Sequence, residues 1–240
     1  TLQLHRLSRL MEVGVTLERA LEIANQYPLA KKEEKLPLMM ASGRILYSDL
    51  KSKVDDPRFD NSAMDGWAVR EADCKEEGTI LRIVGTSQAG SEEIPIVGSG
   101  EACKIMTGAQ IPEGADAIVM VEDSTTQPNN VTINGPARPG FIRRKGENLA
   151  QGTVALSSGT VLTPACISLA ATMGYADVSV VGKPKIAVIG VGDELTPPGE
   201  PLSESSIYES NTFGISSLVE KMGGTPRRLD LIKDSIDHLR

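Results

Sequence analysis

The sequence predicts a fold of mixed class, in which a β-rich part is followed by an α/β part. Between residues 51 and 151, short apolar runs alternate with Gly, Pro, Asn and Ser, which is typical of a small β-barrel or sandwich. From residue 184, an apolar run, a helical segment and a second apolar run predict a βαβ unit with a right-handed crossover. The length of 240 residues is enough for one or two domains.

The first element is a helix, predicted within residues 1–30. Its apolar stripe includes Leu17 and Leu21 at helical spacing, and Glu18 faces outward. The segment MMASGRILYSDL predicts a turn at Ser42-Gly43 followed by a strand.

Strands are predicted next from the runs TILRIVGTSQAG, EACKIMTGAQIPEGADAIVMVED and NVTINGPARPGFIRR. A helix should follow, with Thr163 as its N-cap, Pro164 at its first position and Gly174 at its end. A strand is then expected over residues 177–181. The apolar run at residues 186–189 predicts a strand buried on both faces.

The last predicted elements are a helix and a strand. The helix is expected to be capped by Ser210 or Asn211 and to end at Gly223-Gly224. The strand is expected within residues 225–232.

The composition excludes several functional classes. Apolar residues make up 40% and charged residues 24%, as in ordinary globular proteins. The formal net charge is −7, so broad nucleic-acid binding is not expected. No run of 18 apolar residues and no signal pattern occur, so we expect no membrane segment and a cytoplasmic location.

The cysteines and histidines limit the possible metal chemistry. Cys74, Cys103 and Cys166 are widely spaced, which indicates buried thiols in a reducing compartment and no disulfide framework or zinc site. His5 and His238 lie near opposite ends, so a His-based triad is not expected. A metal would need oxygen ligands, which favours Mg²⁺ or another hard cation.

Two turns carry candidate site residues. Asp65 follows Ser62 in SAMDGWAV, where it either bonds its own backbone in a turn or meets a ligand as a carboxylate held at a corner. Thr107, beside Gly108, either belongs to a tight turn or meets an oxyanion or a metal-bound water.

Two other segments carry charge. Arg143, Arg144 and Lys145 form the densest basic cluster, which fits either phosphate contacts or a solvated edge strand. Asp193 and Glu194 follow the strand at 186–191, where α/β sheets gather ligands. The segment GVGDEL lacks the dinucleotide-binding and Walker A patterns.

In combination, these motifs resemble the molybdopterin molybdenumtransferase family, which includes bacterial MoeA and the E domain of gephyrin. The resemblance covers nearly the whole chain and rests on ordered motifs: SAMDGWAV at 62–69, KIMTGAQIPEGADAIVMVED at 104–123, RPGFIRRKGENL at 138–149, VIGVGDEL at 188–195 and IYESN at 207–211.

The resemblance implies a multi-domain α/β plus β fold. It contains an N-terminal helix segment and an elongated β-rich domain with an inserted β-barrel. A truncated three-layer α/β molybdopterin-binding-like domain follows. By residue, these are 1–32 for the helix segment, 33–50 with 152–183 for the elongated domain, 51–151 for the barrel, and 184–240 for the α/β domain.

The implied function is the last step of molybdenum cofactor synthesis. Molybdate is inserted into adenylated molybdopterin, with Mg²⁺-dependent hydrolysis of the adenylate. A homodimer is implied, with a molybdopterin adenylyltransferase domain or protein as the upstream partner. A hard metal and basic donors suit substrates that carry phosphate groups and an oxyanion.

The resemblance also assigns roles to residues. Asp65, Thr107 and Glu194 are the expected catalytic residues, and Asp65 and Glu194 the expected metal ligands. The expected substrate-binding residues are Ser62, Arg143, Arg144, Asn211 and Asp234.

Two departures from the family pattern motivate alternatives. Asn148 stands where relatives often carry an acid, and Gly190-Val191 stands where Ser-Thr is usual; Thr196 is the nearby hydroxyl. A gephyrin-like scaffold and a catalytically inactive paralogue are the alternative functions.

The chain also lacks the family's later GGVSxG, KPGKP and LPGNP segments, and DSIDHLR at its end has the pattern of the start of a helix. We therefore expect a fragment that does not complete the reaction alone.

Overall fold

The computed structural model describes residues 14–234 and divides the chain into two compact units. Lys35–Val180 form one unit, and the residues up to Glu34 form the other together with those from Val181 onward. Within the described range, none of the helices has the length and apolar character needed to cross a membrane.

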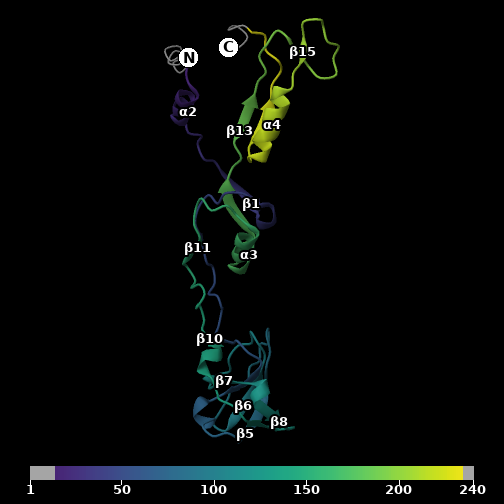
Figure 1. The fold of residues 1–240 in the computed structure, drawn as a ribbon. Coiled ribbons are helices and arrows are strands. Elements are labelled where there is room, and N and C mark those ends of the chain that lie inside the picture. The colour runs from purple at the N-terminus through teal and green to yellow at the C-terminus, as the bar shows by residue number, and fades with distance from the viewer. Residues whose placement is uncertain (1–13, 235–240) are drawn as a thin grey trace. The chain divides into compact units, whose positions relative to one another are not determined.

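A six-stranded sheet dominates the first unit, and Figure 1 labels its strands β5, β6, β7 and β8. The strand order is β7-β4-β6-β5-β9-β8. Its pairs are antiparallel except for the parallel pair β5–β6. The strands are β4 (Gly66–Val69), β5 (Thr79–Ser87), β6 (Glu101–Ile105), β7 (Ala117–Met120), β8 (Ser124–Thr126) and β9 (Asn130–Ile133). β5, β6, β7 and β9 fall within the runs that predicted strands, whereas β4 and β8 lie outside them.

Both faces of this sheet are covered. Side chains alternate along each strand, so Trp67 and Val69 point to one face and Ala68 to the other. The first face carries a core of Trp67, Val69, Leu81, Ala102, Ala117, Val119, Val131 and Ile133; the second carries Ala68, Val97, Cys103, Ile105, Ala109, Ile118 and Ile142. Small and β-branched residues thus fill the interior of a chain with few aromatic residues.

The sheet is curled and open. The register between β5 and β6 shifts between Ile83 and Gly85, and such a bulge bends a strand. Gly85 has a φ of 152°, and a Cβ there would lie 2.7 Å from Pro95 Cγ, so the bend needs glycine. Within residues 14–234 no ladder joins β7 to β8, so the described strand pairs form a half-barrel and do not close a barrel.

The rest of the first unit packs around α3. Two-stranded ladders join β1 to β12 and β2 to β11, and a buried cluster that includes Leu38, Leu46 and Leu162 lies among them. The elements are β1 (Glu33–Pro37), β2 (Leu50–Lys51), β11 (Val154–Leu156), α3 (Pro164–Thr172) and β12 (Asp177–Val181).

The signals for α3 are confirmed. The Thr163 side chain accepts a hydrogen bond from Cys166 N at 3.3 Å, and Pro164 is the first helical residue. Gly174 follows the helix with a φ of 86°, which favours glycine. The strand predicted after Ser42-Gly43 is reduced to isolated bridges at Ile45 and Leu46 before β2.

Short elements connect these parts. They are η1 (Leu38–Met40), β3 (Asn61–Ser62), η2 (Glu71–Asp73), η3 (Val121–Asp123), η4 (Pro139–Phe141) and β10 (Ile142–Arg143). β3 pairs with β10, which places Ile142 opposite Ser62 and Arg143 opposite Asn61.

The second unit contains α2 (Leu17–Asn25), which Thr16 caps by accepting a hydrogen bond from Arg19 N at 3.3 Å. The helix is shorter than the segment that predicted it, and residues 1–13 lie outside the described range. Its apolar stripe is exposed within this unit, at Leu17 and Leu21.

The α/β part has the predicted strand–helix–strand order. β13 (Lys185–Val188) pairs in parallel with β16 (Thr225–Arg228), and α4 (Asn211–Lys221) lies beside β13 (Figure 1). A second parallel pair joins β14 (Leu195–Thr196) to β15 (Ile207–Tyr208). Ser210 is the N-cap residue, but its side chain makes no capping bond.

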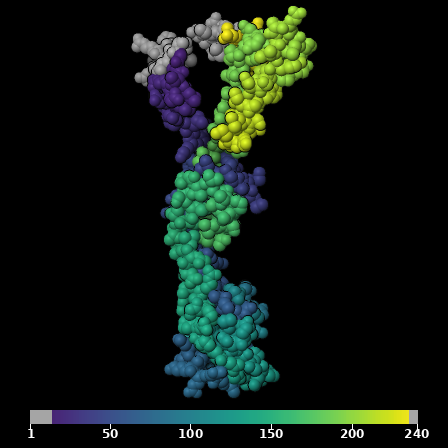
Figure 2. Space-filling view, viewed as in Figure 1, coloured from purple at the N-terminus to yellow at the C-terminus, as the bar shows by residue number. Residues whose placement is uncertain are grey.

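One prediction for this part is wrong. The run 186–189 was expected to be buried on both faces, but Ile186 is 36% and Ile189 43% exposed, and only Val188 is buried. Among the described residues, β13 has β16 as its one strand partner. This two-stranded sheet and the single helix α4 therefore leave the side chains of Ile186 and Ile189 partly exposed. The segment α4, yellow in Figure 2, lies at the surface, and its side chains Ile215 and Leu218 are exposed, as is Met222 directly after the helix. The helix predicted for DSIDHLR lies beyond Asp234, outside the described residues.

Candidate functional site

A tight turn between β3 and β4 carries Asp65. The Ser62 hydroxyl supplies the local bonds of this turn: it donates to Met64 O at 2.6 Å and accepts from Met64 N at 3.3 Å. Ser62 itself is buried. Its hydroxyl therefore has a structural task, and the Asp65 carboxylate is left free of the turn.

The Asp65 carboxylate bonds to a segment 42 residues away. Its Oδ1 accepts hydrogen bonds from Thr107 N and from Thr107 Oγ1, each at 2.7 Å. The alternative in which Asp65 bonds its own turn does not describe this contact. Two residues that the sequence singled out separately therefore lie in direct contact.

The backbone around this pair is tightly fixed. Gly108 N donates to Ser62 O at 2.8 Å, and Val121 N donates to Asp65 O at 3.1 Å. A Cβ on Gly66 would lie 1.9 Å from Val119 O, so only glycine allows β4 to approach β7 so closely. The turn thus holds Asp65 on a packed sheet.

The electrostatics of Asp65 favour a permanent anion. The hydrogen bonds from the Thr107 amide and hydroxyl hold the pKa of Asp65 below its ordinary value. A general base works best with a pKa near the operating pH, and Asp65 lies far from it. Both hydrogen bonds end on Oδ1, so Oδ2 of this exposed side chain is open to a cation.

The basic cluster is paired with carboxylates. Arg144 contacts Asp60 at 2.7 Å, Lys145 contacts Asp55 at 3.4 Å, and Arg143 Nε contacts Glu147 at 3.1 Å. The backbone amides of Lys145 and Arg144 also bond to Asp60 and Glu147, at 2.8 Å and 2.7 Å. The positive charge of the cluster is therefore largely balanced by Glu147 of its own loop and by two carboxylates of the segment 55–60, which favours the structural alternative.

Asn148 has a specific role in this loop. Its Nδ2 donates to Asp56 Oδ2 at 3.0 Å, and its Oδ1 accepts from Arg143 at 3.3 Å. An acid at this position would face the Asp56 carboxylate without a proton to donate. The amide thus fits its surroundings because it supplies both a donor and an acceptor.

The other predicted site residues belong to the second unit. Glu194 is exposed in the turn before β14, Asn211 begins α4, and Asp234 lies after the bridge between Val191 and Ile232. The Glu194 carboxylate folds back over Gly192, where an added Cβ would lie 2.7 Å from Oε2. The structure brings Asp65 and Thr107 together within one unit and groups Glu194, Asn211 and Asp234 in the other.

No preformed metal cluster is evident within residues 14–234, where no group of three or more His, Cys, Asp or Glu is arranged around a common point. Mg²⁺ is usually bound by one or two carboxylates together with substrate phosphates. The open oxygen of Asp65 has the chemistry of such a ligand.

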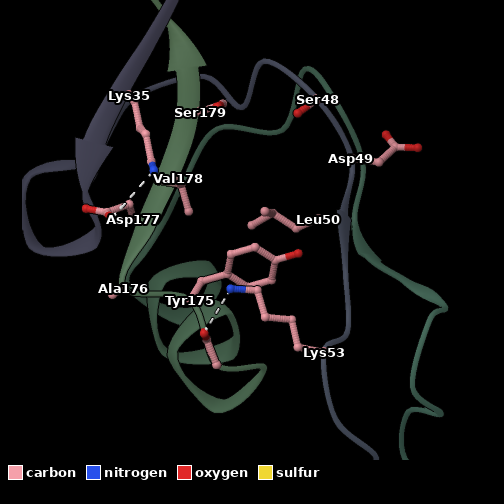
Figure 3. Close-up of a pocket in the computed structure, with 11 residues that line it drawn as sticks. Lys35, Ser48, Asp49, Leu50, Lys53, Tyr175, Ala176, Asp177, Val178 and Ser179 are labelled. Atoms are coloured by element: carbon pink, nitrogen blue, oxygen red, sulfur yellow. Dashed lines mark hydrogen bonds and ion pairs between the residues drawn. The ribbon is translucent and has the colours of Figure 1, made fainter.

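A pocket of about 420 Å³ lies elsewhere in the first unit, lined by Lys35 and by parts of segments 48–53 and 174–179 (Figure 3). Lys53 Nζ lies 3.9 Å from the centre of the Tyr175 ring and 3.1 Å from Gly174 O, and Lys35 lies 3.9 Å from Asp177. Its lysines thus have partners within the pocket, and none of the predicted site residues lines it.

The sequence analysis missed Glu209. This residue lies in the IYESN motif, directly after β15, and its carboxylate bonds to Thr212 at the start of α4. An acid three residues before a helical Thr is the signal that could have identified it as the cap of α4.

Comparison with known proteins gives a consistent result. Residues 15–174 match the family model described as the MoeA N-terminal region (domain I and II). The chain is 39% identical over 227 residues to the molybdopterin molybdenumtransferase of Haemophilus influenzae, covering 92% of the chain and 55% of that relative. It is also 39% identical over 193 residues to molybdopterin molybdenumtransferase 2 of Mycobacterium tuberculosis, covering 78% of the chain and 48% of that relative.

Solved structures agree with the sequence relatives. A crystal structure of the molybdopterin biosynthesis MoeA protein from Pyrococcus horikoshii aligns with a TM-score of 0.84 and 33% identity, over 94% of the chain and 59% of that protein. The chain thus spans about half the length of the curated relatives that it matches.

Proposed function

Because the chain belongs to the molybdopterin molybdenumtransferase family that includes MoeA, we propose that its protein acts in molybdenum cofactor biosynthesis as the enzyme that inserts molybdenum. The substrates are adenylated molybdopterin and molybdate, and the adenylate is hydrolysed in a Mg²⁺-dependent reaction. The family match over residues 15–174 and the names of the relatives support the part of this proposal that concerns molybdenum transfer to molybdopterin.

The contact between Asp65 and Thr107 is the observation that carries the proposal. Both residues come from motifs that identify the family, and the fold places them 2.7 Å apart. A carboxylate of lowered pKa on a packed sheet remains ionised at neutral pH. Such a group suits the binding of a cation that accompanies phosphate groups, because it needs no proton change to act.

We assign Asp65 in the first unit and Glu194 in the second as separate candidate ligands of Mg²⁺. Bound Mg²⁺ would neutralise phosphate charge and polarise a phosphoryl oxygen. Thr107 fixes the Asp65 carboxylate through its amide and hydroxyl, so Oδ2 faces away from the bonded side. Ser62 holds the turn, and Asn211 and Asp234 are proposed to contact substrate from the second unit.

Arg143 and Arg144 keep a secondary place in this proposal. Their ion pairs with Glu147 and Asp60 would have to open, or the guanidinium groups would have to use their remaining N–H donors, for anion contacts.

The proposal extends to organisation and partners. We propose a cytoplasmic homodimer that takes its substrate from a molybdopterin adenylyltransferase domain or protein. We also propose the domain division of the sequence analysis: residues 51–151 form an inserted domain, built on the half-barrel sheet in place of the expected closed barrel, and residues from 184 begin a three-layer α/β domain.

The test uses Asp65→Asn in the protein that contains this chain. Asn keeps an acceptor for the Thr107 donors but removes the charge, so we expect at least about a hundredfold loss of molybdenum insertion with little change in unfolding. Asp49→Asn is the matched control: Asp49 Oδ1 also accepts a distant backbone amide, from Ser158 at 2.7 Å, outside the proposed site.

Both variants are assayed for molybdenum insertion in vitro and for restoration of molybdoenzyme activity in a strain that lacks this step. Normal activity of Asp65→Asn would overturn the assignment of Asp65. Failure of the unmodified protein in both assays would overturn the enzymatic proposal and favour an inactive paralogue or a scaffold.

A further inference from the structure

Glu209 stands apart from the other charged residues of the chain. Over residues 14–234 it is the only charged side chain that is buried, with 3% of its surface exposed. Burial of a charge is unfavourable unless hydrogen bonds replace the lost water. The contacts of Glu209 therefore indicate what keeps the carboxylate in this place.

Each carboxylate oxygen of Glu209 accepts a hydrogen bond from Thr212. Oε1 accepts from Thr212 N and Oε2 from Thr212 Oγ1, both at 2.6 Å, and Thr212 is itself only 2% exposed. The hydroxyl and amide of Thr212 hold the pKa of Glu209 below its ordinary value, so the carboxylate is charged at neutral pH. Glu209 thus caps α4 in place of the Ser210 side chain.

The backbone of Glu209 joins this cap to the turn that carries Glu194. Glu209 N donates to Thr196 O at 2.9 Å, and Ile207 N donates to Glu194 O at 2.9 Å. These bonds lie at the two ends of the β14–β15 ladder. A displacement of Glu209 would therefore move β15, and with it the backbone of Glu194.

The same pair packs against the end of β13. A Cβ on Gly190 would lie 3.3 Å from Thr212 Cγ2 and 3.6 Å from Glu209 Cγ. Gly190 O also accepts from Ile232 N at 2.9 Å. Gly190, which begins the 190–196 turn, and the start of α4 thus meet at one buried point.

We propose that Glu209 is a positioning residue that fixes the turn of residues 190–196, and with it the Glu194 carboxylate, against the start of α4. Its effect on the reaction rests on the proposed function, in which Glu194 holds Mg²⁺. The fixing of the turn is a property of the fold and is measured separately.

The test compares four variants in the protein that contains this chain. Glu209→Ala removes both acceptors, Thr212→Val removes the hydroxyl donor, and Glu209→Gln keeps the size and one acceptor. Glu220→Gln is the matched control, because Glu220 is an exposed acid on the same helix. Hydrogen exchange of residues 190–212 and the Mg²⁺ concentration for half-maximal insertion are measured for each.

In Glu209→Ala we expect exchange at Glu209, Thr212 and the 190–196 turn to accelerate about tenfold or more, because buried donors lose their partners. The half-saturating Mg²⁺ concentration should rise about 10- to 100-fold, as for groups that orient metal ligands. Thr212→Val should show a smaller change, Glu209→Gln should restore most of the wild-type behaviour, and Glu220→Gln should match the wild type.

Unchanged exchange in Glu209→Ala would overturn the proposal. Accelerated exchange confined to the start of α4 would also overturn it, because Glu209 would then only stabilise the helix. Accelerated exchange of the 190–196 turn with an unchanged Mg²⁺ requirement would instead overturn the assignment of Glu194 as a Mg²⁺ ligand. If the unmodified protein inserts no molybdenum, the proposed function fails, and the exchange result alone decides whether Glu209 fixes the turn.

Discussion

The six-stranded sheet and the α/β part hold their candidate residues by different physical means. The sheet has a buried core on each face, and Asp65 sits on a turn where β4 approaches β7 without room for a Cβ. In the α/β part, β13 has one strand partner among the residues that the structure describes, and it is flanked by exposed isoleucines. Buried polar contacts of Glu209 fix the turn that carries Glu194.

This difference shows which changes each region tolerates. Packing against a backbone carbonyl leaves no freedom for relaxation, so the sheet should respond sharply to an added methyl group. The exposed outer face of α4 has room for additional atoms, so α4 should tolerate an added methyl group. Gly66→Ala and Gly214→Ala test this contrast, and Asp60→Asn tests an exposed ion pair for which a smaller effect is expected.

Gly66→Ala should destabilise the first unit by about 3 kcal/mol or more, because the new Cβ would lie 1.9 Å from Val119 O. Gly140→Ala is the control in the same unit, since nothing lies within 4 Å of its Cβ position. Chemical denaturation of both variants measures the difference. Equal unfolding midpoints would show that the sheet relaxes around the methyl group.

Gly214→Ala should stabilise the second unit by about 0.5–1 kcal/mol, because alanine favours a helix interior more than glycine does. No atom lies within 4 Å of the added Cβ. Gly223→Ala is the opposite control. Gly223 follows the end of the helix with a φ of 87°, so an alanine there should destabilise the second unit. Hydrogen exchange along α4 measures both; a loss of protection in Gly214→Ala would contradict the expected space.

Asp60→Asn should have the smallest effect, and that effect should depend on pH. The hydrogen bond from Lys145 N, followed by that from Arg144, lowers the pKa of Asp60 from its ordinary value of 3.8. Its contribution to stability is therefore present above pH 3.8 and is lost as the pH falls below that value toward the lower pKa of the folded state. Solvent screens this exposed pair, so the contribution is small.

Urea unfolding at pH 7 and pH 3 compares wild type with Asp60→Asn. The stability difference should be present at pH 7, shrink at pH 3 and weaken with added salt. A difference that is the same at both values would mean that the charge of Asp60 does not contribute.

Local signals predicted much of the fold. Thr163, Pro164 and Gly174 defined α3, and the run at 177–181 defined β12, because capping and strand signals act within a few residues. The strand–helix–strand order of β13, α4 and β16 also followed from its pattern. The burial of β13 did not follow from the sequence. The apolar character of the run at 186–189 predicts a strand but does not show which segments cover that strand.

The candidate site was predicted as residue types and not as contacts. The sequence singled out Asp65 and Thr107 separately, but their contact depends on the pairing of β4 with β6, which no local pattern specifies. It left open whether Arg143 and Arg144 contact phosphate or lie on a solvated edge, because it could not show that Glu147 and Asp60 pair with them. Glu209 was missed because the sequence shows that this residue is charged but does not show that its side chain is buried.

Gly190 has a consequence for the sequences of related proteins. A Cβ at this position would lie 2.7 Å from Leu231 Cδ2 and 3.3 Å from Thr212 Cγ2, so residues 190, 212 and 231 share one small volume. A larger side chain at 190 needs a smaller or differently oriented one at 231. Positions 190 and 231 should therefore covary in related proteins, with a hydroxyl residue at 190 accompanied by a shorter side chain at 231.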